Sequence, residues 1–295
     1  MNEGQINIWK KDALMHILMA LAQNERIREV LIFKGALILN MRLGTERMSL
    51  DIDSNLDQSF TLQCPDRADQ QKFLEENIPV AVTKYFENQD PVRYELNNLR
   101  ITMNPRADHP RGWNAFLIRI TLTDNQNASV RGLPALTIDV AAPETLTAKS
   151  ISEIPWVRAS IKAYTLERIA GEKARAFLSS LPTYRAKVKK PGEAVRAKDL
   201  YDLTRIYQAK DTEAREFWET AGEEFRLACE SRYIDCLGIE SFKEDWETTI
   251  STYNEDAIIP NDIPFDVVEE TLEKIVETWK DMGIIPFTVP LPDKT

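Results

Sequence analysis

Two aspartates that stand two residues apart, Asp51 and Asp53, are the residues of this sequence with the clearest capacity for chemistry. Polar and apolar residues alternate around them, and side chains of an extended strand alternate between its two faces. The spacing predicts one polar face with Arg47, Ser49, Asp51 and Asp53, and one core face with Met48, Leu50 and Ile52. Carboxylates so spaced can hold Mg²⁺ or Mn²⁺ together with substrate phosphates. The pair alone would more often be an ordinary surface feature.

The residues before this pair predict a turn that suits a phosphate group. Residues 30–33 form a short apolar run, Lys34 and Gly35 follow, and residues 36–43 have the pattern of a helix that Gly44 ends. A glycine lets the backbone approach a phosphate closely, and the start of a helix favours negative charge. Lys34 and Gly35 are therefore candidate nucleotide contacts.

The elements that must position these groups indicate an α+β fold. Helical periodicity covers residues 8–23 and 69–88, and extended segments cover residues 47–53, 94–103, 115–123 and 136–141, which predicts a small mixed sheet. Long amphipathic helices follow over residues 166–180, 198–208, 212–233, 241–253 and 267–282. We expect a sheet domain over residues 1–159 and a helical domain over residues 160–295. In the last helix, Asp266 and Glu269 are expected to form a capping box, with Gly283 ending the helix.

Four further charged residues interrupt or border the apolar stripes of predicted strands and helices. Asp139 alternates with apolar residues in an extended segment, as a solvent-facing strand residue or a metal ligand would. Lys173 interrupts the apolar stripe of its helix, so it either extends to the surface or meets a buried anion. Asp199 and Asp202 border a core-facing stripe, although Asp199 also suits the first turn of a helix.

These separated motifs together resemble the AbiEii/AbiGii toxin-like family of the nucleotidyltransferase superfamily, found in abortive-infection and type IV toxin–antitoxin systems. The resemblance spans residues 31–207. It implies a nucleotidyltransferase-type mixed sheet flanked by helices, with a helical C-terminal part that completes the active site. It also implies that Asp51, Asp53 and Asp139 bind metal and are catalytic together with Lys173. The implied nucleotide contacts are Lys34, Gly35, Arg47, Ser49, Lys173, Asp199 and Asp202.

The implied activity is transfer of a nucleotide from a nucleoside triphosphate to an RNA acceptor. Related toxins extend the 3′ ends of transfer RNA and so stop translation, and their usual partner is an antitoxin of the winged-helix repressor type. The sequence departs from the family at Ala36, where a second glycine or a small hydroxyl residue is common. Two alternatives therefore stay open: an interaction protein without catalysis, and a nucleotidyltransferase that modifies a small-molecule or protein hydroxyl.

The charge of the chain is unevenly distributed. The 295 residues have a formal net charge of −10, which at first argues against an RNA-binding protein. Residues 149–198, however, contain 12 basic and four acidic residues, whereas residues 211–295 contain 22 acidic and seven basic ones. The basic segment predicts RNA contacts on a loop and the helix after it, at Arg185, Lys187, Lys189, Lys190 and Arg196. A lysine-rich loop that is merely solvated would have the same composition.

The remaining composition indicates a globular protein of the cytoplasm. Three cysteines at no metal-ligand spacing suggest reduced thiols, and the N-terminal residues lack the apolar run of a signal peptide or a membrane span. We expect no membrane association.

Overall fold

The computed structural model describes residues 1–44, 47, 49–109, 111–127, 130, 132–156, 159–189, 194–210 and 214–292. Its contacts divide the chain into two compact units. The first unit consists of Met1–Ile38, Met48–Glu144 and Ile151–Tyr164, and the second of Leu39–Arg47, Thr145–Ser150 and Thr165–Thr295. The expected α+β class is confirmed.

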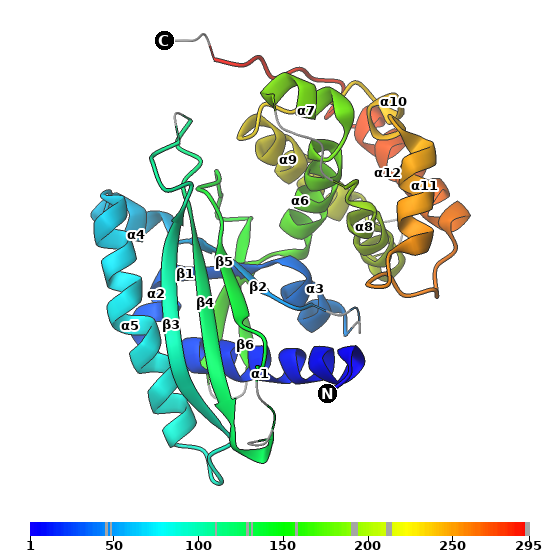
Figure 1. Cartoon of the computed structure of the whole chain (residues 1–295). Helices are drawn as coiled ribbons and strands as arrows, with labels where there is room; N and C mark the ends of the chain where they lie inside the picture. Colours follow the sequence, from blue (N-terminus) through cyan, green and yellow to red (C-terminus); the bar gives the residue numbers. More distant parts are fainter. Residues whose placement is uncertain are drawn as a thin grey trace. The chain divides into compact units, whose positions relative to one another are not determined.

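The first unit is built on a seven-stranded mixed sheet with the strand order β3-β4-β5-β2-β1-β7-β6 (Figure 1). The strands are β1 Leu31–Lys34, β2 Ile52–Leu56, β3 Tyr94–Asn104, β4 Ala115–Asp124, β5 Leu136–Val140, β6 Ile151–Trp156 and β7 Ala159–Tyr164. Pairing is parallel between β2 and β5 and between β1 and β7, and antiparallel between the other neighbours.

One face of this sheet carries the core. In β5, Leu136, Ile138 and Val140 are buried, whereas Thr137 and Asp139 on the opposite face are half-buried. Helices of the same unit pack on β3, β5 and β7: α1 Glu3–Gln23, α2 Glu25–Val30 and α5 Arg67–Glu87. The short helix α4 Gln58–Gln63 precedes α5. Asp139 thus belongs to the polar face of the sheet, which we call the open face.

The second unit is helical. Its elements are α6 Leu166–Ser179, α7 Pro182–Val188, α8 Ala197–Lys210, α9 Arg215–Glu230, α10 Ile239–Phe242, α11 Trp246–Glu255 and α12 Phe265–Asp281. The predicted buried stripe of α12 is confirmed, because Val268, Leu272, Ile275 and Trp279 are at most 2% exposed. The predicted capping box is wrong: Pro264 is the N-cap residue of α12, and no side chain caps the helix. Gly283 follows the helix with φ 71°.

Three further expectations about elements need correction. The strand predicted over residues 47–53 begins only at Ile52, so Arg47, Ser49 and Asp51 precede it. The antiparallel pair β6–β7 occupies residues that the sequence pattern did not assign to strands. Arg185 and Lys187 lie on α7 and not on a loop; Pro182 at the first position suits this helix because proline lacks only an N–H that would be unpaired there.

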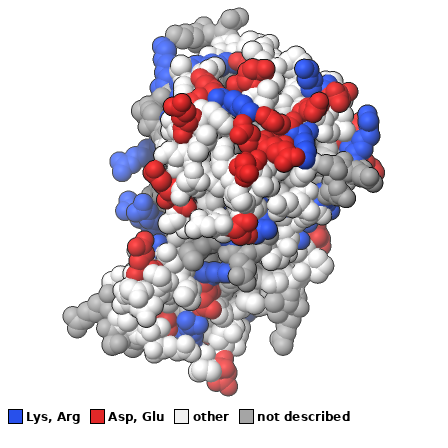
Figure 2. All heavy atoms as spheres, turned by 90° about the vertical axis from the view of Figure 1, so that its right-hand side faces the viewer, with Lys and Arg blue, Asp and Glu red and all other residues white. Residues whose placement is uncertain are grey.

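Charged side chains of both signs lie on the face of the protein that Figure 2 shows. Figure 2, which looks from the side of α11 and α12, shows acidic and basic side chains next to one another. Several are ion pairs; Lys243 Nζ, for example, lies 2.6 Å from Glu269 and 2.5 Å from Glu273. Among the described helices, none is both long and apolar enough to cross a lipid bilayer.

Candidate active site

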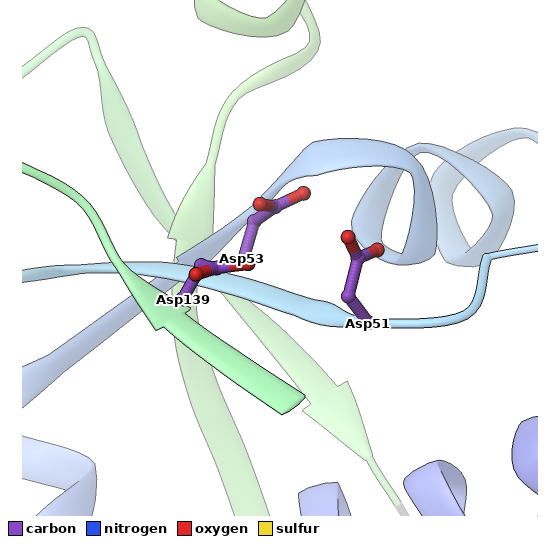
Figure 3. A group of neighbouring side chains, drawn as sticks. All are labelled: Asp51, Asp53 and Asp139. Carbon is purple, nitrogen blue, oxygen red and sulfur yellow. The ribbon is translucent and has the colours of Figure 1, made fainter. Parts of the chain in front are cut away.

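The first unit brings three carboxylates together. Asp51, Asp53 and Asp139 each offer an oxygen, and these oxygens all lie within 4.8 Å of one another. All three residues are half-buried. Figure 3 shows them gathered where β2 and β5 run side by side, with Asp51 on the segment that leads into β2. Three hard oxygen donors in so small a volume have the composition of a site for Mg²⁺ or Mn²⁺.

Strand register explains why two of these residues meet. Asp53 in β2 and Asp139 in β5 are direct partners in the parallel pair, so their side chains leave the same face of the sheet. Asp51 stands one residue before β2, where the hydroxyl of Ser49 lies 3.3 Å from its Oδ1 and 3.2 Å from its carbonyl oxygen. Ser49 itself is buried. The cluster therefore depends on the pairing of β2 with β5 and on the contacts of Ser49 with Asp51.

Gly35 lies against the carboxylate of Asp53. Its φ is 75°, and a Cβ at this position would stand 2.0 Å from Asp53 Oδ2. Only glycine leaves room for that oxygen, and Gly35 is also the first residue of α3 Gly35–Leu43, whose N-terminal end favours negative charge. The predicted role of Gly35 in phosphate binding stays a prediction.

The pKa of Asp139 reflects this environment. Partial burial raises it above the ordinary value, and the nearby charge of Asp51 raises it further. Both effects penalise the ionised form of a carboxyl group, and a divalent cation would offset both. The residues of the cluster therefore fit a metal ion in their donor type and in their electrostatics.

Lys34 takes part in a network that the sequence did not reveal. It pairs with Asp53 in the register of β1 and β2, and its Nζ lies 3.5 Å from Glu144 Oε1. Tyr164 donates a hydrogen bond of 3.0 Å to the other oxygen of Glu144 and accepts one from Asn55. Residues far apart in sequence join here, and no local periodicity could have indicated them.

The second unit holds a different cluster, formed by four predicted site residues. Lys173 Nζ lies 2.9 Å from Asp199 and 2.7 Å from Asp202, and Arg47 approaches both oxygens of Asp202, with its Nε at 2.6 Å and its Nη2 at 2.9 Å. Arg196 completes it at 2.5 Å from Asp199. Arg47, Lys173, Asp199 and Asp202 are at most 7% exposed.

Mutual attraction decides the charge states in this cluster. Burial alone would lower the pKa of Lys173, but the carboxylates of Asp199 and Asp202 outweigh it and raise that pKa. Burial would raise the pKa of Asp199, yet Lys173 and Arg196 hold it well below the ordinary range. Such a network is expensive to break, because removal of one partner leaves a buried charge without compensation.

These contacts correct one expectation. Arg47 and Ser49 were predicted on a common strand face with Asp51 and Asp53. Arg47 instead turns its guanidinium to Asp202, 155 residues later in the chain, and belongs to the second unit. Ser49 is the one of the two that contacts the acidic cluster, through Asp51.

The predicted RNA-binding residues are partly engaged within the second unit. Lys187 Nζ lies 2.8 Å from Asp235 and 2.6 Å from the carbonyl oxygen of Val289, and Arg196 pairs with Asp199. Lys189 ends α7 with φ 54°, and Arg185 is half-buried on the same helix. Lys190 lies outside the described residues.

Comparison with protein families assigns most of the chain to one family. A family model described as nucleotidyl transferase AbiEii toxin of type IV toxin–antitoxin systems matches residues 16–278, which is most of the chain. No curated protein matches the sequence.

Proposed function

The chain belongs to the AbiEii nucleotidyl transferase toxin family, and on this premise we propose that it transfers a nucleotide from a nucleoside triphosphate to an RNA acceptor. The cluster of Asp51, Asp53 and Asp139 next to the start of α3 is the observation that carries the proposal. We further propose that the acceptor is the 3′ end of a transfer RNA, so that the activity blocks translation in the cytoplasm.

In the proposed reaction, the terminal hydroxyl oxygen of the acceptor attacks the α-phosphorus of the triphosphate. The bond between this phosphorus and the oxygen leading to the β-phosphorus breaks, and pyrophosphate leaves with the electron pair. Asp51 and Asp53 would hold divalent metal, and Asp139 would either complete this metal site or take up the hydroxyl proton of the acceptor. When bound, Mg²⁺ or Mn²⁺ supplies neutralisation of the phosphate charge.

The proposed nucleotide contacts are assigned within each unit separately. In the first unit we assign this role to Lys34, Gly35 and Ser49, which surround the acidic cluster in space or register. In the second unit the family motif alone suggests Lys173, with Arg47, Asp199 and Asp202. A fall in triphosphate affinity on Lys173→Met, measured by calorimetry at a temperature where the variant is folded, is the expected result.

A proposed partner follows from the family. Type IV toxin–antitoxin systems pair such an enzyme with an antitoxin, here proposed to be of the winged-helix repressor type. Co-expression of the candidate antitoxin should then relieve the growth arrest that this chain causes.

The decisive experiment uses labelled triphosphates and three kinds of acceptor. The protein is incubated with Mg²⁺, each triphosphate labelled at the α- or the γ-phosphate, and either total RNA, protein or small hydroxyl compounds. We expect the α-label, and not the γ-label, in RNA, and expect Asp51→Asn and Asp53→Asn to abolish it. Glu76→Gln, an exposed carboxylate on α5, is the matched control and should transfer normally.

Each alternative predicts a different result. Label in protein or in small molecules would assign the enzyme to another acceptor class. No transfer together with no metal-dependent triphosphate binding would identify an interaction protein, as Ala36 suggests. Transfer to RNA at the normal rate by Asp51→Asn would refute the role of the cluster.

A further inference from the structure

Two arginines face each other on the open face of the sheet. Arg100 in β3 and Arg119 in β4 are direct partners in the antiparallel register, and both are exposed. Across the described residues, neither forms an ion pair with a carboxylate. Like charges directly opposite each other destabilise a strand pair, so this arrangement costs the fold some stability. A bound anion would remove that cost.

The arginine pair lies close to the acidic cluster within the same unit. Arg119 is the register partner of Thr137 in β5, and Asp139 follows two residues later on the same face. Such diagonal neighbours in a sheet stand about 7–8 Å apart. Arg119 is therefore one strand away from Asp139 and Arg100 two strands away, and all three residues belong to the open face.

The hairpin that carries the pair has a second feature of nucleic-acid binding at its tip. His109 and Trp113 stack with their ring centroids 5.1 Å apart, and the guanidinium of Arg111 lies 5.3 Å from the Trp113 ring. Trp113 is half-buried, so part of its surface stays accessible. Aromatic side chains beside arginines are the usual platform on which unpaired bases stack.

The charge of the β3–β4 hairpin and the distance along it indicate the kind of ligand that it can bind. Between residues 96 and 120 the chain has four arginines and a single acid, Asp108, which pairs with Arg67 of α5. At about 3.3 Å per residue, β3 extends about 13 Å from Arg100 to its end at Asn104. A ligand that contacts both the arginine pair and Trp113 has to be extended, and a polyanion that carries bases suits both contacts.

We propose that the open face of the β3–β4 hairpin binds the single-stranded 3′ segment of the RNA acceptor. Arg100 and Arg119 contact its phosphates, and Trp113 stacks on one of its bases. The proposal rests on the proposed function for the identity of the ligand. It shifts the expected RNA surface from the basic segment of the helical unit, where Lys187 and Arg196 already have carboxylate partners, to the sheet.

The test measures RNA binding separately from catalysis. A fluorescent single-stranded RNA of twelve nucleotides is titrated with the full chain in EDTA without triphosphate, over a series of salt concentrations. For the double variant Arg100→Gln/Arg119→Gln, we expect at least tenfold weaker binding at low salt. Loss of two phosphate contacts should also lower the magnitude of the salt slope by about 1.4. Trp113→Ala should weaken binding about tenfold without changing the slope.

A charge-matched control is available on the opposite side of the sheet. Lys72→Gln/Lys84→Gln removes two exposed charges from α5 and should leave affinity and slope close to those of the wild type. Thermal unfolding of all variants excludes misfolding, and the double arginine variant should melt no lower than the wild type because its like-charge contact is gone.

The possible outcomes separate the two proposals. An unchanged salt slope in the double arginine variant, or absence of RNA binding by the wild type, overturns the assignment of this surface. Weaker triphosphate binding with unchanged RNA affinity also overturns it, since the pair would then be a nucleotide contact. RNA binding through the pair by a chain that transfers no nucleotide would sustain this proposal and refute the proposed function.

Discussion

At the scale of single residues, the contact between Gly35 and Asp53 couples backbone conformation to the acidic cluster. Gly35→Ala adds a methyl group 2.0 Å from Asp53 Oδ2, so the carboxylate must move. We expect loss of Mn²⁺ binding in calorimetry and a destabilisation of about 1–2 kcal/mol from the positive φ.

Gly44→Ala is the matched control for this prediction. Gly44 has φ 65°, and nothing lies within 4 Å of its added Cβ. It should cost similar stability while leaving Mn²⁺ affinity intact. Equal metal binding by the two variants would show that the position of Asp53 does not matter.

The depressed pKa of Asp199 predicts how the free energy of unfolding changes at acidic pH. Because its folded pKa is depressed, its contribution is present above its unfolded pKa of about 3.9 and is lost as pH falls below it. Asp199→Asn should therefore lower the free energy of unfolding by about 3–5 kcal/mol near pH 7, and the difference from wild type should shrink between pH 5 and pH 3. Urea unfolding across this range measures it, with exposed Glu76→Gln as control. A difference that is constant with pH would contradict the charged pair.

Residue types and their local spacing predicted many residues of the candidate site. They did not predict contacts between residues that are far apart in the sequence. The alternation in residues 136–140 placed Asp139 opposite the core, as the structure has it. No pattern linked Arg47 to Asp202 or Lys34 to Glu144, because periodicity reports only which face a side chain occupies. The roles assigned to these residues stay predictions.

At the scale of elements, α6 and α9 pack closely enough that one glycine matters. A Cβ on Gly171 would stand 2.5 Å from the backbone nitrogen of Phe225 and 2.8 Å from the carbonyl carbon of Glu224. Alanine normally stabilises a helix interior by about 0.5–1 kcal/mol. Here we expect Gly171→Ala to destabilise by about 1–3 kcal/mol, because the two helices must separate.

Gly4→Ala in α1 tests the same substitution without the packing constraint. Its nearest neighbour would be Asn2 Oδ1 at 3.7 Å, an ordinary contact. Thermal unfolding should show opposite signs for the two variants. A stabilised Gly171→Ala would indicate that α6 and α9 can move apart at little cost.

The boundaries of helices and strands were hardest to predict where buried polar side chains or an earlier helix start override the local pattern. Residues 47–51 alternate as a strand does, but Arg47 and Ser49 are buried by polar contacts, and the ladder starts at Ile52. Asp266 has the spacing of a cap, yet Pro264 already sets the start of α12. Alternation and capping signals describe local preference, which tertiary contacts can override.

At the scale of the whole molecule, we expect metal binding to raise the free energy of unfolding. A ligand that binds only the folded state raises the free energy of unfolding, by about 2.7 kcal/mol at one hundred times its dissociation constant. We expect Mn²⁺ to raise the melting temperature of the wild type and to leave Asp53→Asn unchanged. Addition of EDTA should reverse the rise. An equal rise in both proteins would place the ion elsewhere.

The net charge of −10 described this molecule poorly. Residues 211–295, with 22 acidic and seven basic residues, have a larger negative net charge than the whole chain. The net charge of the whole chain therefore gives no sign of the arginines in the β3–β4 hairpin. Overall charge limits solubility and long-range attraction, whereas recognition depends on where charges lie. Composition alone could not place the arginine pair, because its formation needs the strand register.

The register that joins Asp53 to Asp139 also sets an order of events during synthesis. The ribosome completes Asp51 and Asp53 long before β5, so the cluster cannot form until that strand has emerged and paired. The partner of Arg47 emerges later still. A nascent or prematurely ended chain that stops before β5 therefore lacks the assembled cluster, and the proposed metal site cannot exist until nearly half of the 295 residues have been joined.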